Sequence, residues 1–273
     1  MNTTKNYIKS LILNIIFKSN FLLNRLYADD ELRNFIAKFR EKYVSCELVC
    51  IGGDGDGSYL VPNDLHNVKY CFSPGVDYSA DFEKELSDRF GIKSFLADAS
   101  VTSAPIDNQN FVFLQKFIGS ANDPKYITLS DWIYESIGND SSKKILQMDI
   151  EGGEYDVFSF EDSSTLASFS TLIIEFHNLE RLFNKPFLQI FSSIFEKIYK
   201  NFSICHVHPN NGCGLLTIKD ITVPKVMEVT FIRNDLLANL KTNNEISLPH
   251  SLDSKNAPDK PDIVMPELWW KHL

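Results

Sequence analysis

Short apolar runs alternate with segments of helical period through the middle of the chain. Runs such as "YCFSPGV" (70–76), "KKILQMDI" (143–150) and "STLIIEFH" (170–177) have the length of buried strands, and the segments 79–91 and 187–200 have the pattern of helices. Strands that are apolar throughout and joined by helices usually pair in parallel, with helices on both faces of the sheet. We therefore predict an α/β domain of the Rossmann-like class, with a mostly parallel sheet flanked by helices.

The two ends of the chain differ from this middle. Strand-like runs between 202 and 235 predict an antiparallel hairpin at the end of the sheet. From residue 241 the sequence is polar and proline-rich, and Trp269 and Trp270 are expected to anchor it. The predicted parts are an N-terminal helical extension (1–45), the main domain (46–240) and an extended C-terminal tail packed on it (241–273).

Residues 7–27 are the most apolar part of the N-terminal extension. Lys9, Asn14 and Lys18 are among the polar residues that interrupt them, so no uncharged stretch is long enough to cross a bilayer. Apolar residues at helical spacing predict an amphipathic helix that packs on the domain, on a second copy in a homodimer, or on the inner face of a membrane. We expect a cytoplasmic protein, either free or peripheral at that membrane face.

The composition excludes some partners. The 273-residue chain has 36 Asp and Glu against 27 Lys and Arg, giving a net charge of −9 without a basic cluster. Nucleic-acid binders usually show a basic face, so we predict no nucleic-acid partner. The five cysteines are odd in number and lack zinc-ligand spacing, which favours buried free thiols in a reducing cytoplasm.

In a parallel α/β sheet, ligands bind beyond the carboxyl ends of the strands. The run 70–76 contains a single glycine at its end, Gly75, where a diphosphate site would need several. A lone glycine suits a loop that passes close under a ligand without phosphates, such as a nucleoside carrying an amino acid. Asp98 follows the next run, where a carboxylate can accept hydrogen bonds from both ribose hydroxyls.

The segment "ILQMDIEGGEYDVF" carries the strongest signal. An apolar strand places Asp149 and Glu151 at its carboxyl end, before two glycines and a helix, and the next strand ends in Glu175 and His177. Acidic residues at a helix start are favoured by the helix dipole, but a carboxylate at the end of a buried strand also needs a partner. We predict that the two strand ends form one polar pocket floor.

These segments resemble the FkbM-like S-adenosylmethionine (SAM) methyltransferases, through "QMDIEGGEYDVF" and "LIIEFH". "GGDGDGSYLVPNDL", "CFSPGVDYSADFEKEL" and "HVHPNN" are similar to segments of the branch related to methyltransferase-like protein 24. Gly53 and Pro74 depart from that branch, which usually has an arginine and an aromatic residue there, and "FLADAS" lacks its Asp-Pro. The resemblance spans about residues 48–235 and implies that 46–240 is a SAM-dependent methyltransferase domain.

The resemblance also implies roles for individual residues. Gly75 and Val76 would pass beneath the methionine part of SAM, Asp98 would hold the ribose, and Asp149 would lie near the sulfonium. The whole cofactor-binding set is Asp56, Gly57, Gly75, Val76, Glu83, Asp98, Ala99, Asp149 and Glu151. The acceptor-binding set is Tyr59, Glu175, His208, Asn210 and Asn211.

Methyl transfer to a hydroxyl needs an aligned acceptor and removal of its proton. His177 is the first choice of general base, because imidazole titrates near neutral pH, and His206 is the second. His206 and His208 have an alternative role in satisfying backbone groups of the turn after them. A divalent ion held by the same carboxylates and histidines is a further alternative, but no local metal-site spacing supports it, so we predict no metal ligands.

The glycine-aspartate run within 48–65 is compatible at first with a phosphate loop, a calcium loop or a hairpin. It leads into a strand-like run rather than a helix, and the twelfth position from Asp54 is Leu65 rather than the glutamate of a calcium loop. A hairpin remains. We predict that it covers the cofactor pocket, with Asp56 able to reach the amino group of SAM.

The predicted function is SAM-dependent O-methylation of a sugar hydroxyl in a bacterial surface glycan or glycolipid, within polysaccharide biosynthesis. The sugar follows from the resemblance alone. Two alternatives stay open: O-methylation of a small secondary metabolite, and a non-catalytic domain of the same fold that acts as a scaffold for glycan assembly.

Overall fold

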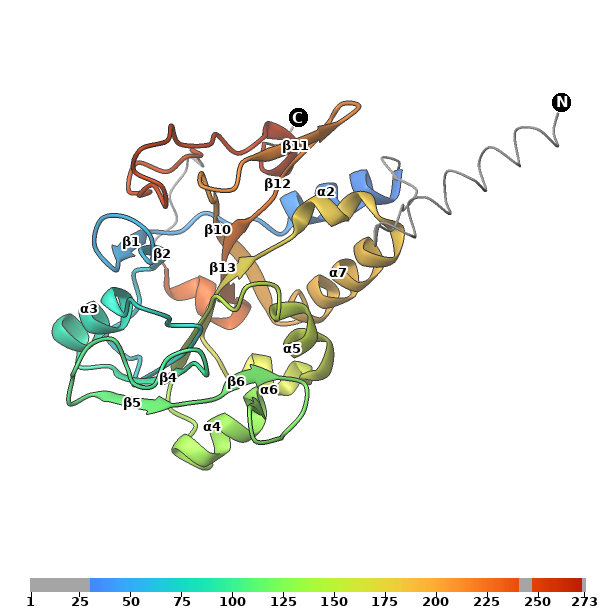
Figure 1. Ribbon diagram of the computed structural model, residues 1–273. Helices are drawn as coiled ribbons and strands as arrows, with labels where there is room; N and C mark the ends of the chain where they lie inside the picture. The colour runs from blue at the N-terminus through green and yellow to red at the C-terminus, as the bar shows by residue number, and fades with distance from the viewer. Residues whose placement is uncertain (1–29, 241–246, 272–273) are drawn as a thin grey trace, which may run out of the picture.

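The computed structural model describes residues 30–240 and 247–271, and a seven-stranded sheet forms its centre (Figure 1). The strands of this sheet are β3 (Tyr70–Pro74), β4 (Lys93–Ala97), β5 (Phe111–Leu114), β8 (Lys144–Met148), β9 (Thr171–Phe176), β10 (Phe202–Pro209) and β13 (Met227–Arg233). They lie in the order β10-β13-β9-β8-β3-β4-β5. The strands from β5 to β9 are parallel, and β13 is antiparallel to both of its neighbours. The predicted mostly parallel sheet and its antiparallel end are confirmed.

The order of the strands reverses between β3 and β8. The chain builds outward from β3 to β4 and β5, then returns to the other side of β3 with β8 and β9. This reversal is the switch point of a doubly wound sheet, where ligands bind beyond the strand ends.

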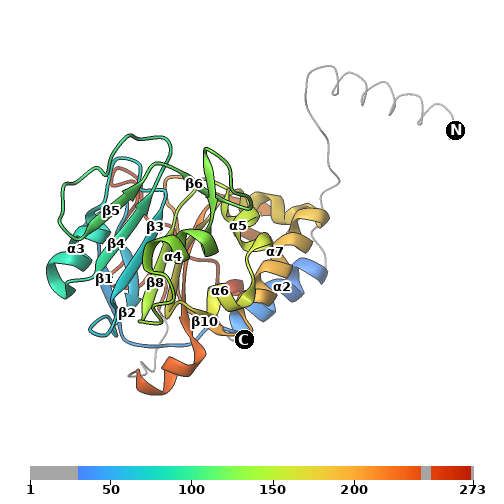
Figure 2. The same cartoon turned by 90° about the horizontal axis from the view of Figure 1, so that it is seen from below.

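Apolar side chains cover both faces of the sheet, because successive residues of a strand point to opposite sides. Cys71 and Ile145 pack on one face with α3, whereas Phe72 and Leu146 pack on the other face in the main core. The helix α2 lies alongside α7 in both views (Figures 1 and 2), with the rings of Phe35 and Phe191 5.1 Å apart. The helices are α2 (Asp30–Glu41), α3 (Asp81–Phe90), α4 (Leu129–Ile137), α5 (Glu154–Phe160), α6 (Ser163–Ala167) and α7 (Lys185–Ile198).

Three two-stranded pairs stand beside the central sheet. The antiparallel pairs are β1 (Leu48–Ile51) with β2 (Tyr59–Pro62) and β11 (Leu215–Ile218) with β12 (Ile221–Pro224), and the parallel pair is β6 (Phe117–Gly119) with β7 (Tyr126–Thr128). The short 3₁₀ helices are η1 (Leu179–Phe183), η2 (Asn234–Asn239) and η3 (Glu267–Trp269).

The C-terminal segment joins the main core. Trp269 is fully buried, its ring packs edge-on against Phe39 of α2 at 5.2 Å, and its Nε1 donates to the carbonyl of Thr222 at 2.9 Å. Trp270 is half-buried and donates to Met265 of its own segment. The amphipathic helix predicted for residues 7–27 lies outside the described residues. Within the described part of the chain, no helix is long and apolar enough to cross a membrane.

Candidate active site

A cavity of about 740 Å³ opens at the carboxyl ends of β3, β4 and β8, at the switch point of the sheet. The predicted cofactor residues that line it are Asp56, Gly57, Gly75, Val76, Glu83, Asp98, Asp149 and Glu151. Ala99 does not line it, because its neighbours Asp98 and Ser100 form that part of the wall. Of the predicted acceptor residues, Tyr59 alone lines the cavity.

Gly75 is required by the main chain. Its φ is +88°, and a Cβ atom there would lie 1.6 Å from the main-chain oxygen of Asp149. The loop after β3 therefore crosses directly against the end of β8, which glycine permits. Gly75 lines the cavity, and its contact with Asp149 is a second reason for a glycine here, beside the predicted close approach to a ligand, which stays a prediction.

The Asp98 carboxylate is buried at the end of β4 and already accepts three hydrogen bonds. Its Oδ1 accepts from the N–H and the hydroxyl of Ser100 at 2.7 and 2.6 Å, and its Oδ2 accepts from the N–H of Asp77 at 3.0 Å. A carboxylate has about four acceptor positions, so one remains on Oδ2 for a ribose hydroxyl. Bonds to both hydroxyls, as predicted from the sequence, would require Ser100 to turn away.

Buried polar side chains from two central strands are linked to the same cavity, which Gln147, Tyr59 and Glu83 line. The Ser73 hydroxyl donates to Glu83 and lies 2.6 Å from Gln147 Oε1, and Gln147 Nε2 donates to the Tyr59 hydroxyl at 3.1 Å. Burial raises the pKa of Glu83 to about 7. Sequence reasoning missed Ser73 and Gln147, although each is a polar residue in an otherwise apolar strand and therefore needs a partner.

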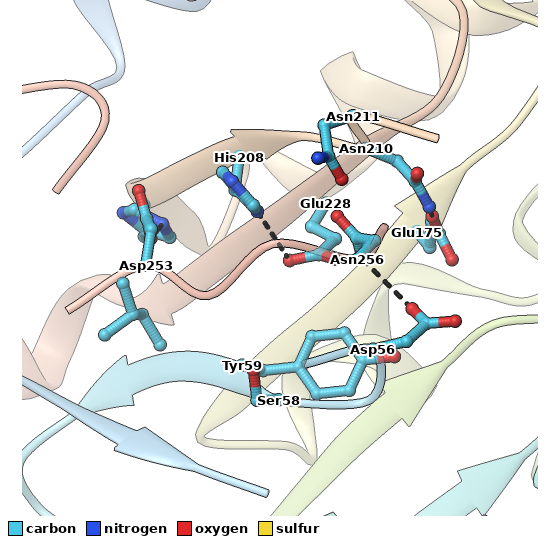
Figure 3. A network of polar contacts seen from close by, with 12 residues as sticks. Asp56, Ser58, Tyr59, Glu175, His208, Asn210, Asn211, Glu228, Asp253 and Asn256 are labelled. Carbon is cyan, nitrogen blue, oxygen red and sulfur yellow. Dashed lines mark hydrogen bonds and ion pairs between the residues drawn. The ribbon is translucent and has the colours of Figure 1, made fainter. Parts of the chain in front are cut away.

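The predicted hairpin of β1 and β2 is confirmed, and its turn forms one wall of the cavity through Asp56 and Gly57. Asn256 of the C-terminal segment donates to Asp56 Oδ1 at 3.1 Å and to Glu228 Oε1 at 2.7 Å (Figure 3). The C-terminal segment thus connects the turn of the hairpin to β13.

Four carboxylates surround the ring of His177, beyond the end of β9. His177 Nε2 lies 3.6 Å from Asp149 Oδ1, 3.4 Å from Glu151 Oε2 and 4.0 Å from Glu175 Oε2, and Nδ1 lies 3.5 Å from Glu154 Oε1. These separations are longer than a normal hydrogen bond. The structure therefore brings together the four residues predicted for the pocket floor and adds Glu154.

The start of α5 holds His177 through its main chain. The His177 N–H donates to Glu154 Oε1 at 2.7 Å, and the His177 carbonyl accepts from the Tyr155 hydroxyl. The ring itself gains no hydrogen bond from these contacts, and its Nδ1 is buried without a hydrogen-bond partner. The imidazole is thus placed next to Asp149 and Glu151, which line the cavity.

Burial and like charge favour protonated forms in this group. Burial, reinforced by the charge of Glu175, raises the pKa of Asp149 well above its usual range, and burial also raises the pKa of Glu175. Burial lowers the pKa of His177, but the carboxylates of Glu154, Glu175 and Glu151 outweigh that effect and raise it overall. Groups coupled in this way share protons and titrate together.

Residues 83–203 match the methyltransferase FkbM domain. The matched segment runs from α3 to the start of β10 and includes Asp98, Asp149 and His177. The protein is a SAM-dependent methyltransferase with an FkbM domain. No curated protein sequence matches the chain.

Solved structures of similar shape include other methyltransferases. Fibrillarin in complex with Nop5p has 11% identity, covers 63% of this chain and 75% of its own, and gives a TM-score of 0.39. The Methanococcus jannaschii fibrillarin pre-rRNA processing protein has 9% identity, 62% and 68% coverage and a TM-score of 0.36. A 16S rRNA adenine methyltransferase from Catenulisporales acidiphilia has 11% identity, 68% and 98% coverage and a TM-score of 0.31. These likenesses are too low to transfer any substrate or partner to the present methyltransferase.

The histidines of β10 lie outside the cavity wall of the methyltransferase. His206 is buried, with Nε2 2.8 Å from Asp253 Oδ1, and His208 Nε2 lies 3.2 Å from Asp262 Oδ1. Burial lowers the pKa of His208, but the carboxylate of Glu228 outweighs it and raises the pKa to about 9. The prediction of His206 as an alternative base is corrected, because the C-terminal segment covers and pairs it.

The two asparagines after β10 have partners in different parts of the molecule. Asn210 donates to Glu175 Oε1 at 2.8 Å and so supports the carboxylate group near the cavity. Asn211 donates to the carbonyl of Ala257 at 2.9 Å and accepts from its N–H at 2.8 Å. His208 and Asn211, both predicted to bind the acceptor, are therefore engaged by the C-terminal segment.

Three aromatic residues that sequence reasoning missed line the mouth of the cavity. Tyr78 is 83% exposed, and the Phe117 and Tyr126 rings from β6 and β7 lie 5.6 Å apart, both partly exposed. Exposed rings at a cavity mouth can stack on a planar base or a sugar face. The sequence signal for two of them was an aromatic pair in polar surroundings, "FIGSANDPKY".

Asp149, Glu151 and His177 could also hold a metal ion, since one ligand atom of each lies within 4.8 Å of the others. The sequence prediction of no metal ligands rested on the lack of local spacing. In the fold, these three candidate ligands come from two separate strand ends, an arrangement that a short motif does not show, and the prediction stays untested.

Proposed function

We propose that this methyltransferase transfers the methyl group of SAM to a sugar hydroxyl of a bacterial surface glycan or glycolipid. The observation that carries the proposal is the position of the His177 imidazole, beside two carboxylates of the cavity wall and beyond the switch point of the sheet. An imidazole with carboxylates can receive the proton that an acceptor hydroxyl must lose.

The cavity suits SAM in size and charge. Its volume of about 740 Å³ lies within the range of cofactor sites. We assign the ribose to Asp98, the amino group of SAM to Asp56, and the sulfonium to the neighbourhood of Asp149. Each contact joins a carboxylate with a hydroxyl or a cation, which is the favourable pairing in a partly buried site.

For the acceptor we propose Tyr59, Glu175 and Asn210 as hydrogen-bonding partners. Asn210 and Glu175 are already bonded to each other, so a sugar would meet a fixed amide–carboxylate pair. Cytoplasmic location, contact with the inner membrane face and a homodimer remain predictions.

The first experiment is calorimetric titration of the purified protein with SAM and with S-adenosylhomocysteine. We expect saturable, sub-millimolar binding of both. Absence of binding would sink the enzyme assignment and favour the scaffold alternative.

The second experiment identifies the acceptor class. The protein is incubated with SAM and separate panels of sugar glycosides, glycolipids and phenolic metabolites, and products are analysed by mass spectrometry for one added methyl group. We expect products only among the sugars and glycolipids. Methylation confined to the phenolic panel would replace the sugar proposal by the small-metabolite alternative.

A further inference from the structure

We infer that Asp149, Glu151 and His177 form a binding site for one divalent metal ion at the acceptor side of the cavity. Asp149 and Glu151 follow β8 and line the cavity, and His177 follows β9 and lies against both. The three ligands are thus contributed by two adjacent strand ends.

The distances suit a cation better than direct hydrogen bonds. Nε2 of His177 lies 3.4 and 3.6 Å from the two carboxylate oxygens, and all three atoms lie within 4.8 Å of one another. An ion placed between such atoms would lie roughly 2.0–2.4 Å from each, the range of metal–oxygen and metal–nitrogen bonds. Direct N–H···O bonds would instead need about 2.7–3.2 Å.

The polar atoms around this point lack partners. His177 is 8% exposed, and its Nε2 points at the two carboxylates, whereas its other ring nitrogen, Nδ1, faces Glu154 at 3.5 Å. Asp149 Oδ1 is also buried without a hydrogen-bond partner. Buried polar atoms left in this state are costly unless a ligand completes them.

The number of carboxylates also suits a cation, because a bound ion would replace the protons that like charge and burial otherwise favour here. Together with Asp149 and Glu151, Glu154 and Glu175 place four carboxylates around His177. In the described part of the chain, the ion pairs of these four carboxylates all involve His177. An imidazole with carboxylates suits Mn²⁺ or Zn²⁺ better than Mg²⁺ or Ca²⁺, which prefer oxygen ligands alone.

The consequence for catalysis rests on the proposed function. A cation at this point would coordinate the acceptor hydroxyl and lower its pKa. His177 Nε2 would then hold the ion instead of taking the proton, and the acceptor hydroxyl would give its proton to the neighbouring Glu175 carboxylate as its oxygen takes the methyl group and S-adenosylhomocysteine leaves.

Metal binding is tested without SAM or acceptor, so its failure is separate from failure of the proposed function. Chelator-treated protein is titrated with Mn²⁺, and free ion is counted by electron paramagnetic resonance, with Zn²⁺ and Mg²⁺ as competitors. We expect one Mn²⁺ per chain, displaced by Zn²⁺ more readily than by Mg²⁺. Absence of saturable binding of all three ions would overturn the site.

Variants then locate the ion. Glu151→Gln is the main one, because its side chain is 86% exposed and its replacement leaves the core intact. We expect it, like Asp149→Asn and His177→Ala, to weaken Mn²⁺ binding at least ~10-fold, whereas the exposed His66→Ala control binds like the wild type. Unchanged binding in both Glu151→Gln and Asp149→Asn would place the ion elsewhere and refute the site. Methyl transfer that persists undiminished in chelator would refute the catalytic role of the ion.

Discussion

Two groups of buried histidines and carboxylates lie on the same central sheet, and only one of them borders the cavity. At the ends of β8 and β9, His177 has four carboxylates nearby and no hydrogen bond to its ring. On β10, His206 lies 2.8 Å from Asp253, and His208 pairs with Glu228 and Asp262. The same residue types therefore border a cavity in one place and pair with the C-terminal segment in the other.

The difference lies in what covers each group. Residues 250–262 lie over the face of β10 and β13 and supply Asp253, Asn256 and Asp262 as partners, the first two of which Figure 3 labels. At the end of β8, by contrast, Asp149 and Glu151 line the cavity. A buried polar group that a protein segment satisfies stabilises the fold, whereas one left next to a cavity is available to a ligand.

The largest expected effect is a difference between alanine substitutions of one histidine from each group. His177→Ala should lower kcat by a factor of about 10²–10⁴, the usual contribution of acid–base or metal-assisted activation, with SAM affinity nearly unchanged. His206→Ala should leave the kcat of folded enzyme intact but cost about 3 kcal/mol of stability, because the buried Asp253 carboxylate loses its charged partner and keeps only the hydrogen bond from the His250 N–H. Kinetics and denaturant unfolding of both variants check this. A large loss of kcat in fully folded His206→Ala would break the comparison.

The next effect concerns the backbone at the switch point. Gly75→Ala would place a Cβ 1.6 Å from the Asp149 carbonyl oxygen at a φ of +88°, so the end of β3 or β8 must move. We expect a loss of about 4 kcal/mol or more in the free energy of unfolding. Gly53→Ala is the matched control, because its φ is +82° with no atom within 4 Å, and it should cost about 1–2 kcal/mol. Equal losses in urea unfolding would show that contact with Asp149 is unimportant.

The sequence predicted the parallel sheet, its antiparallel end and the strand-end acids, because these features are written in local patterns. Period and length identify strands, and the carboxyl ends of parallel strands must meet at one edge. These two rules are sufficient to place Asp98, Asp149 and Glu151 at the cavity.

The roles of the remaining residues depended on contacts distant in sequence. His206 and His208 have the same strand setting as a catalytic histidine, and only the position of Asp253 and Asp262, roughly fifty residues later, shows that they are paired. Gly75 was correctly singled out, but its neighbour Asp149 lies 74 positions away along the chain. Single-sequence patterns carry no information about such pairings.

A smaller effect is expected at the ribose position. Asp98→Asn removes a charged acceptor from the cavity wall while preserving its shape, and charge-assisted hydrogen bonds contribute about 1.5–3 kcal/mol. SAM affinity should fall roughly 10–100-fold in calorimetry. Asp259→Asn, an exposed residue of the C-terminal segment, is the control and should bind SAM normally. Wild-type affinity in Asp98→Asn would remove the ribose assignment.

A further effect is a difference in pH dependence between the two regions. Burial raises the pKa of Glu83 at the cavity from 4.5 to about 7, and Glu228 outweighs burial to raise that of His208 from 6.5 to about 9. In both cases the folded state binds the proton more tightly, so stability falls as pH rises, by at most about 1.4 kcal/mol per pH unit for each group. The stability that protonated Glu83 contributes is lost between pH 4.5 and 7, and the stability that protonated His208 contributes is lost between pH 6.5 and 9.

Two variants assign these windows. Glu83→Gln should flatten the fall in unfolding free energy in the acidic window while leaving the alkaline one, and Glu228→Gln should do the reverse, because His208 loses its main partner. Urea unfolding at half-unit pH steps checks both. Glu228→Gln could instead remove the fall in unfolding free energy between pH 4.5 and 7. The groups at the cavity and under the C-terminal segment would then titrate together, and the distinction between them would fail.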